Sequence, residues 1–200
     1  MIKNLLFDCS DTLLRFSSKV DLAVSLRDPE RAERIHNTFF KSEHWKQFDN
    51  GLLTDGEMKE IFQPLFSAED WAVAENYFDT FTDHYVPFEG IEDLLAELKA
   101  KGYRLYLVSD YPPRFTRLWE TYGFFRLFDG RAVSYEVHGS KRDLRLFSYL
   151  LENYALDPAE CLFFDDMECL VDNAKEFGID GHVFKGTEDL RRYLKDIAVL

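Results

Sequence analysis

The stretch Ile2–Leu14, which reads IKNLLFDCSDTLL, decides the fold and places the first candidate functional side chain. Leu5, Leu6 and Phe7 form a continuous apolar run, which is typical of a central strand covered on both faces. Asp8 follows this run directly. Ligands of open α/β sheets bind just outside the carboxyl ends of the strands. Asp8 is therefore a candidate functional residue, and a capping or turn carboxylate is the alternative interpretation.

Helical and strand-like patterns alternate along the second half of the chain. Apolar runs predict strands over residues 103–108, 131–134, 161–164 and 182–184. Apolar residues at helical spacing separate these strands, and Gly102, Gly123 and Gly178 each follow such a segment as a helix stop. This alternation predicts an α/β fold with a Rossmann-like, doubly wound parallel sheet and right-handed crossovers.

Residues 15–85 differ from the rest of the chain, because they show several helix signals and no convincing strand. Thr54 and Glu57, for example, have the spacing of a capping box at a helix N-terminus. Long insertions between strands are commonly functional or form a subdomain. The sequence therefore predicts an inserted α-helical cap domain at 15–85, and a core domain built from 1–14 and 86–200.

The composition is that of an acidic globular protein. The chain has 200 residues, a formal net charge of −13 at pH 7 and 46% hydrophobic residues. This charge argues against a nucleic-acid partner or an anionic membrane surface. No apolar run approaches membrane-spanning length, and no signal peptide precedes the first strand. The three cysteines have no paired spacing, so we expect free thiols and a cytoplasmic location.

Polar side chains at four positions are expected to meet at one edge of the predicted sheet. Asp8 ends the first strand, Ser109 the second and the pair Asp165-Asp166 the fourth, while Lys141 begins the helix after the third. Several carboxylates can hold a divalent cation, which offsets the repulsion between an attacking carboxylate and an anionic phosphate. A hydroxyl and an ammonium can hold phosphate oxygens. The combination suits phosphoryl transfer through a covalent aspartyl-phosphate.

These residues resemble the motifs of the haloacid dehalogenase superfamily of phosphatases, in the subclass with a helical cap inserted after the first strand. The segment Asp8–Thr12 resembles the DxDxT motif of that family, and Ser109 resembles its strand-end serine or threonine. Lys141 resembles the family lysine, and Asp165-Asp166 the acidic pair. The motifs occur in order over most of the core, and four of them together are specific. The chain is also similar to the bacterial glucose-1-phosphate phosphatase branch, which departs from DxDxT at the second Asp.

The resemblance implies a Mg²⁺-dependent phosphatase that hydrolyses a small phosphorylated metabolite, a sugar phosphate, through an aspartyl-phosphate on Asp8. It implies that Asp8, the backbone carbonyl of Ser10, and Asp166 ligate the metal. It leaves two roles open for Asp165, which would bind the metal through water or hold Lys141.

The resemblance also implies that the Ser109 hydroxyl and the Asp110 amide grip phosphate, and that Lys141 neutralises it. One departure affects catalysis, since Ser10 stands where most family phosphatases carry an Asp that acts as general acid and base. A serine hydroxyl is a poor proton shuttle near pH 7, and losing such a group can lower a rate about 10²–10⁴-fold. Asp11 lies one residue after the position of the second Asp of the family motif, and strand-like alternation predicts that its side chain points away from the site.

Ser10 leaves three hypotheses for the function. A phosphatase would tolerate it if the leaving group is good, as an anomeric sugar oxygen or an acyl phosphate is. A catalytically weak binding or regulatory protein would tolerate it too. A haloacid dehalogenase, which acts without metal, is the third hypothesis. The Asp165-Asp166 pair argues against the last, because two adjacent carboxylates are costly without a cation.

Two further expectations concern residues around this site. Asp110 adds negative charge near the phosphate unless it pairs with Arg114 or caps the next helix. Trp45, Gln47 and Phe48 are candidate substrate contacts from the predicted cap.

Overall fold

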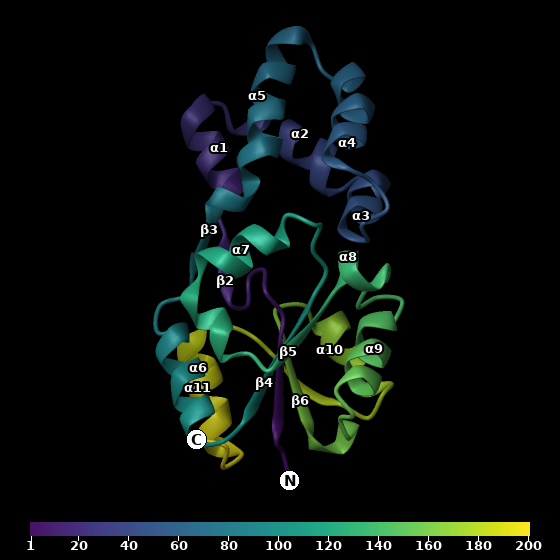
Figure 1. Ribbon diagram of the computed structural model, residues 1–200. Helices are drawn as coiled ribbons and strands as arrows, with labels where there is room; N and C mark the ends of the chain where they lie inside the picture. The colour runs from purple at the N-terminus through teal and green to yellow at the C-terminus, as the bar shows by residue number, and fades with distance from the viewer.

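The computed structural model describes all 200 residues and contains two sheets (Figure 1). The large sheet has five strands in the order β5-β4-β1-β6-β7, and all of its neighbouring strands are parallel. These strands are β1 (Asn4–Phe7), β4 (Arg104–Ser109), β5 (Gly130–Val133), β6 (Cys161–Asp165) and β7 (Asp180–Val183). The predicted α/β fold class is confirmed.

Strand β1 lies at the centre of the large sheet, and all four of its residues are buried. Phe7 lies opposite Leu107 of β4 on one side and Phe164 of β6 on the other. Leu5 and Phe7 pack into one apolar cluster and Leu6 into a second, because successive side chains of a strand point to opposite faces. Both faces are therefore covered, which explains the unbroken apolar run before Asp8.

Helices cover the two faces of this sheet, with α6 and α11 on one face and α9 and α10 on the other (Figure 1). The helices of this part are α6 (Ile91–Ala100), α7 (Phe115–Thr121), α8 (Ser134–Val137), α9 (Arg145–Asn153), α10 (Glu168–Lys175) and α11 (Thr187–Asp196), with 3-10 turns η3 (Gly123–Leu127) and η4 (Pro158–Glu160). Gly102 and Gly178 follow α6 and α10 with φ of 91° and 77°, a left-handed conformation that suits a helix stop. None of the helices combines the length and apolar character that a bilayer crossing requires.

A group of helices lies beyond the carboxyl ends of the sheet strands (Figure 1). It contains α1 (Ser18–Leu26), α2 (Pro29–Phe40), α3 (Glu43–Asp49), α4 (Asp55–Phe62) and α5 (Ala68–Thr80), with 3-10 turns η1 (Gln63–Leu65) and η2 (Phe81–His84). The predicted capping box of Thr54 and Glu57 is confirmed at the start of α4. We call residues 18–84 the helical segment.

Two short strands flank the helical segment, and they correct the expectation that residues 15–85 contain none. Strand β2 (Leu14–Phe16) pairs antiparallel with β3 (Tyr85–Pro87). Each has three residues, which is too short to show a strand-like alternation in the sequence.

The helical segment is held together by an aromatic core, and this core corrects a second expectation. Trp45 and Phe48 of α3 are buried in it, beside Phe78 of α5. Gln47 is exposed on the opposite side of α3. The two aromatic residues expected to contact substrate therefore stabilise the helical segment instead.

Candidate active site

Three of the predicted site residues meet in a buried cluster at the carboxyl edge of the large sheet. The Nζ atom of Lys141 donates hydrogen bonds to Oδ1 of Asp8 at 2.6 Å and to Oδ2 of Asp165 at 2.7 Å. Asp8 follows β1 and Asp165 ends β6, and these strands are neighbours in the sheet. The adjacency of the strands therefore brings together residues that are far apart in the sequence.

Lys141 reaches this cluster from a loop, not from the start of a helix as expected. The next helix, α9, begins only at Arg145. Side chains hold the loop in place of helical hydrogen bonds. The Lys141 amide donates to Oδ1 of Asp110 at 3.0 Å, and Nδ2 of Asn173 donates to the Lys141 carbonyl at 3.3 Å.

The cluster carries more negative charge than one lysine balances. Carboxylate oxygens of Asp8, Asp165 and Asp166 all lie within 4.8 Å of one another. Burial raises the pKa of Asp8 well above its usual range although Lys141 opposes the shift, and burial with the Asp165 charge raises the pKa of Asp166 to about 6. Burial disfavours the charge on Lys141, but Asp8 and Asp165 hold its pKa above the usual value. The oxygen-rich, electron-rich donor set fits a hard divalent cation.

The two acidic residues after β6 differ in their contacts. Asp165 is fully buried and uses both carboxylate oxygens, since Oδ1 accepts from the Met167 amide at 2.8 Å and Oδ2 binds Lys141. Asp166 is exposed as a whole residue although its carboxylate is partly desolvated, and its side chain makes none of these contacts. Its carboxylate is therefore the freer of the two to bind a ligand.

Ser109 ends β4 and Asp110 follows it, beside the neighbouring strand β1, after which Asp8 lies. The Ser109 hydroxyl is buried and has no hydrogen-bond partner within the chain, which is costly unless a ligand supplies one. Asp110 takes up neither of the two alternatives, since it does not pair with Arg114 and does not cap the next helix. Its carboxylate accepts a hydrogen bond from the Lys141 amide instead. Arg114 is bound by the helical segment instead, so it is not available to Asp110.

The side chain at position 10 is a hydroxyl, and its hydrogen-bond partner comes from β3, the strand that follows the helical segment. Ser10 Oγ lies 3.1 Å from Oη of Tyr85 in β3. Asp11 is exposed, and its Oδ1 accepts from the Phe16 amide at 3.0 Å, so its carboxylate stabilises the turn that leads into β2. Cys9 is fully buried in the core, as expected.

The helical segment contacts the loops of this site through residues 49–51, at the C-terminal end of α3. Ser134 Oγ donates to the carbonyl of Asp49, and Nδ1 of His138 lies 3.0 Å from the Asn50 carbonyl oxygen. Gly51 has a φ of 68° and lies so close to the core that an added Cβ would be 2.8 Å from the Tyr135 carbonyl oxygen. Glycine at this position is needed for both the conformation and the close approach.

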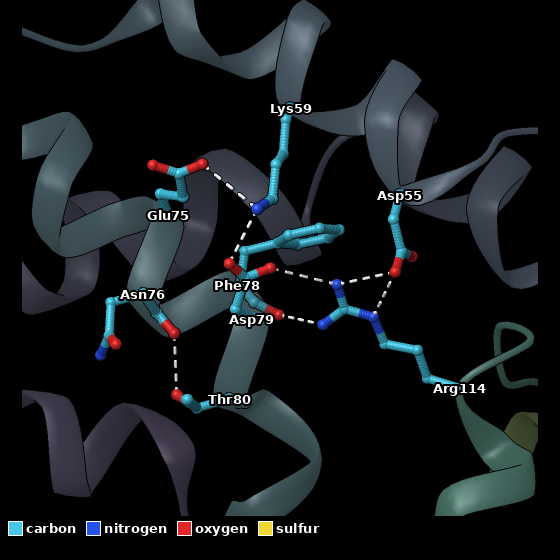
Figure 2. A network of polar contacts seen from close by, with 8 residues as sticks. All are labelled: Asp55, Lys59, Glu75, Asn76, Phe78, Asp79, Thr80 and Arg114. Carbon is cyan, nitrogen blue, oxygen red and sulfur yellow. Dashed lines mark hydrogen bonds and ion pairs between the residues drawn. The ribbon is translucent and has the colours of Figure 1, made fainter.

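A second contact is formed by Arg114, which lies between β4 and α7 (Figure 2). Its Nη2 atom is 3.0 Å from Oδ2 of Asp55 in α4 and 3.4 Å from Oδ1 of Asp79 in α5. Nη1 donates to the Phe78 carbonyl, and the guanidinium lies 4.3 Å from the centre of the Phe78 ring. Nζ of Lys59 lies 2.7 Å from the second carboxylate oxygen of Asp79, Oδ2. Asp79 therefore forms ion pairs with both Lys59 and Arg114.

A parallel α/β sheet with this arrangement of strand-end residues defines a class of hydrolases, and comparison with known families identifies it. The family model described as haloacid dehalogenase-like hydrolase matches residues 2–168. The chain belongs to this family, and it is a hydrolase.

Individual relatives are more distant. Flavin mononucleotide hydrolase 1 of the Arabidopsis thaliana chloroplast is 22% identical over 197 residues, which are 98% of this chain and 77% of that protein. Drimenol cyclase drtB of Aspergillus calidoustus is 24% identical over 206 residues, and the match spans 98% of this chain but only 37% of that protein. The narrower similarity to glucose-1-phosphate phosphatases stays a prediction.

Solved structures of related enzymes have the same fold. A HAD family enzyme from Bacteroides thetaiotaomicron in complex with magnesium and inorganic phosphate superimposes with a TM-score of 0.71 and 24% identity, over 93% of this chain and 96% of that one. L-2-haloacid dehalogenase from Xanthobacter autotrophicus gives a TM-score of 0.69 and 21% identity, over 100% of this chain and 85% of the other. At these identities, the likeness concerns the fold.

Proposed function

We propose that the chain is a Mg²⁺-dependent phosphatase that hydrolyses a small phosphorylated metabolite through an aspartyl-phosphate on Asp8. The observation that carries this proposal is the cluster in which Lys141 alone faces the three carboxylates of Asp8, Asp165 and Asp166. The orphan hydroxyl of Ser109 beside it suits a phosphate oxygen. The related Bacteroides enzyme was solved with magnesium and inorganic phosphate, which supports the same ligands here.

The metal would be held by the carboxylates of Asp8 and Asp166 and by the backbone carbonyl of Ser10. Bound Mg²⁺ would neutralise charge on the phosphate and on the attacking carboxylate. Asp165 already uses its oxygens for Lys141 and the Met167 amide, so we assign it to positioning Lys141.

The reaction would take two displacements at phosphorus. An oxygen of Asp8 attacks, the ester bond from phosphorus to the leaving oxygen breaks, and Lys141, Ser109 and the Asp110 amide hold the phosphoryl oxygens. Water then attacks the aspartyl-phosphate, which releases phosphate and restores Asp8. Ser10 offers no carboxylate to protonate the leaving oxygen, so we propose a substrate whose leaving group needs little protonation, such as a sugar phosphate with an anomeric oxygen.

We assign the role of a cap domain to residues 15–85, with the core formed by 1–14 and 86–200. The position of these helices beyond the strand ends supports this division, and the contacts of residues 49–51 with α8 and of Arg114 with α4 and α5 tie them to the core. Closure of such a cap excludes water from the reaction. The three cysteines are free thiols, and we propose a cytoplasmic location.

The test is phosphate release from sugar phosphates, acyl phosphates and flavin mononucleotide, with Mg²⁺ and with EDTA. We expect metal-dependent release that Asp8→Asn abolishes and that Asp93→Asn, an exposed acid on α6, leaves unchanged. Halide release from 2-haloacids without phosphate release would instead support a dehalogenase. A folded protein that binds Mg²⁺ but releases neither product would support the binding or regulatory protein.

A further inference from the structure

A polar cavity lies between the helical segment and the core loops that carry Lys141. Its volume is about 380 Å³, and none of its eight lining residues is hydrophobic. We call this space the polar pocket. The helical segment contributes Glu43, Lys46, Asp49 and Asn50, and the core contributes Asp110, Ser140, Arg142 and Asp143, so four lining residues are acidic and two are basic. Small-molecule sites are usually lined mainly by apolar side chains, so this lining selects for a polar ligand.

The polar pocket adjoins the catalytic cluster through the chain on both sides of Lys141. Ser140 and Arg142 flank that lysine, and Asp110 accepts a hydrogen bond from its amide. The Lys141 ammonium at the other end of the same residue binds Asp8. A phosphate held against Asp8 and Lys141 therefore has the polar pocket beside it, where a leaving group can extend.

The pocket offers both acceptors and donors of hydrogen bonds. Asp49 and Asp110 supply carboxylates from the two sides of the interface, and burial together with the nearby Asp110 charge raises the pKa of Asp49 well above its usual range. Lys46 and Arg142 supply donors. Arg142 makes no ion pair, since its guanidinium contacts only the sulfur atoms of Cys169 and Met167, at 3.9 and 4.0 Å.

We propose that the polar pocket binds a polyhydroxylated leaving group and that Asp49 is the residue that selects it. The proposal rests on the proposed phosphatase function and narrows its substrate class. A hydroxyl donates to Asp49 and Asp110 and accepts from Lys46 and Arg142, so it satisfies both kinds of lining group without adding charge. An ammonium would satisfy only the carboxylates, and the flat ring system of a flavin would find no apolar wall.

The position of Asp49 depends on contact between the helical segment and the core. Its carbonyl accepts from Ser134 Oγ, the next carbonyl lies 3.0 Å from His138 Nδ1, and Gly51 packs against Tyr135. These contacts hold the backbone of Asp49 beside the pocket. Selection of the leaving group is therefore coupled to docking of the helical segment.

The test measures binding in an Asp8→Asn background, which retains an amide oxygen at the site and needs no turnover. Calorimetry in the presence of Mg²⁺ would compare glucose 1-phosphate, glucose 6-phosphate, sorbitol 6-phosphate, flavin mononucleotide and inorganic phosphate. We expect at least one of the three polyol phosphates to bind more tightly than inorganic phosphate. Adding Asp49→Asn should raise the Kd of that polyol phosphate about tenfold or more, because one of the two side-chain oxygens that can accept from a hydroxyl is replaced by an NH₂ group, and leave the Kd of inorganic phosphate unchanged.

Glu60→Gln is the matched control, because Glu60 is an exposed acid on α4 outside the pocket. It should change neither constant, and thermal unfolding should show that the Asp49→Asn protein is folded. The proposal is overturned if no polyol phosphate binds more tightly than inorganic phosphate, or if Asp49→Asn weakens the binding of the polyol phosphate and of inorganic phosphate equally. Selective binding without turnover by the unmutated chain would reject the phosphatase function alone, whereas phosphate release from acetyl phosphate without selective binding would reject the pocket alone.

Discussion

Lys141 and Arg114 each bind two carboxylates, and the two clusters differ mainly in burial. Lys141 and its partners Asp8 and Asp165 have side chains that are at most 6% exposed. The two carboxylates around Arg114 are 52% and 43% exposed (Figure 2). Exposed ion pairs contribute little to stability, whereas a buried cluster is costly to form and very costly to break. The Lys141 cluster is therefore held firmly in the interior, whereas the Arg114 cluster is a weak polar contact between the helical segment and the segment that follows β4.

The largest effect is expected for Lys141→Met. Removing the cation leaves buried carboxylates without a partner, and we expect a loss of about 3–5 kcal/mol in the free energy of unfolding. Phosphate release should fall about 10²–10³-fold, because a preorganised group that stabilises charge is lost. Urea unfolding and steady-state kinetics would measure both. Lys175→Met is the control, since Lys175 is 55% exposed and pairs only with Asp172, and it should change stability by no more than about 0.5 kcal/mol.

Mg²⁺ is expected to have the next largest effect, because it supplies positive charge that the buried cluster lacks. A ligand at 100 times its Kd stabilises the folded state by about 2.7 kcal/mol, so Mg²⁺ should raise the Tm of EDTA-treated protein. Asp166→Asn should abolish most of this increase. An equal Tm with and without Mg²⁺ would contradict a metal site at Asp8 and Asp166.

A smaller effect is expected for Arg114→Ala, which removes the exposed cluster. We expect a loss of about 1–2 kcal/mol, from two screened ion pairs and one contact with an aromatic ring, and the loss should shrink in 1 M NaCl. Hydrogen exchange should increase in α4 and α5 more than in the large sheet. Arg117→Ala is the control, because Arg117 is 58% exposed and pairs only with Asp83. A loss as large as that of Lys141→Met would show that burial does not separate the two clusters.

The smallest effect concerns pH and lies inside the helical segment. His36 Nδ1 is 2.7 Å from Oη of Tyr77, and burial lowers the pKa of His36 from 6.5 to about 4. The folded chain therefore binds fewer protons than the unfolded chain between about pH 4 and 6.5, and stability falls as the pH falls through this window. Since the ring is partly exposed, we expect His36 to account for about 1 kcal/mol of that fall. Urea unfolding at pH 4.5 and 7.5 should show a smaller difference for His36→Gln than for His44→Gln, which changes an exposed histidine.

The meeting of Asp8 with Asp165 could be predicted from the sequence because it follows from a geometric rule, and their catalytic roles stay a prediction. Asp8 and Asp165 each follow an apolar run, and the carboxyl ends of adjacent parallel strands share one edge. The loop conformation of Lys141 and the partner of Asp110 could not be predicted, because both depend on hydrogen bonds between segments distant in sequence.

The residues of the interface were missed for a different reason. Their place in the predicted cap suggests Trp45 and Phe48 as substrate contacts, but at helical spacing they share the buried face of α3. Lys46 and Asp49 are also three residues apart, and they share the face toward the polar pocket. The 3.6-residue period of this helix is the signal that could have separated the two pairs.

The antiparallel pairing of β2 with β3 places Leu14 opposite Pro87, so the chain leaves the core and returns to it at one junction. The helical segment is thus a loop whose ends are already joined by backbone hydrogen bonds. Lengthening such a loop costs little chain entropy, about 0.6 kcal/mol for each doubling. The junction therefore tolerates inserts of different length between β2 and β3, while the strand ends that carry Asp8 and Asp165 stay in place.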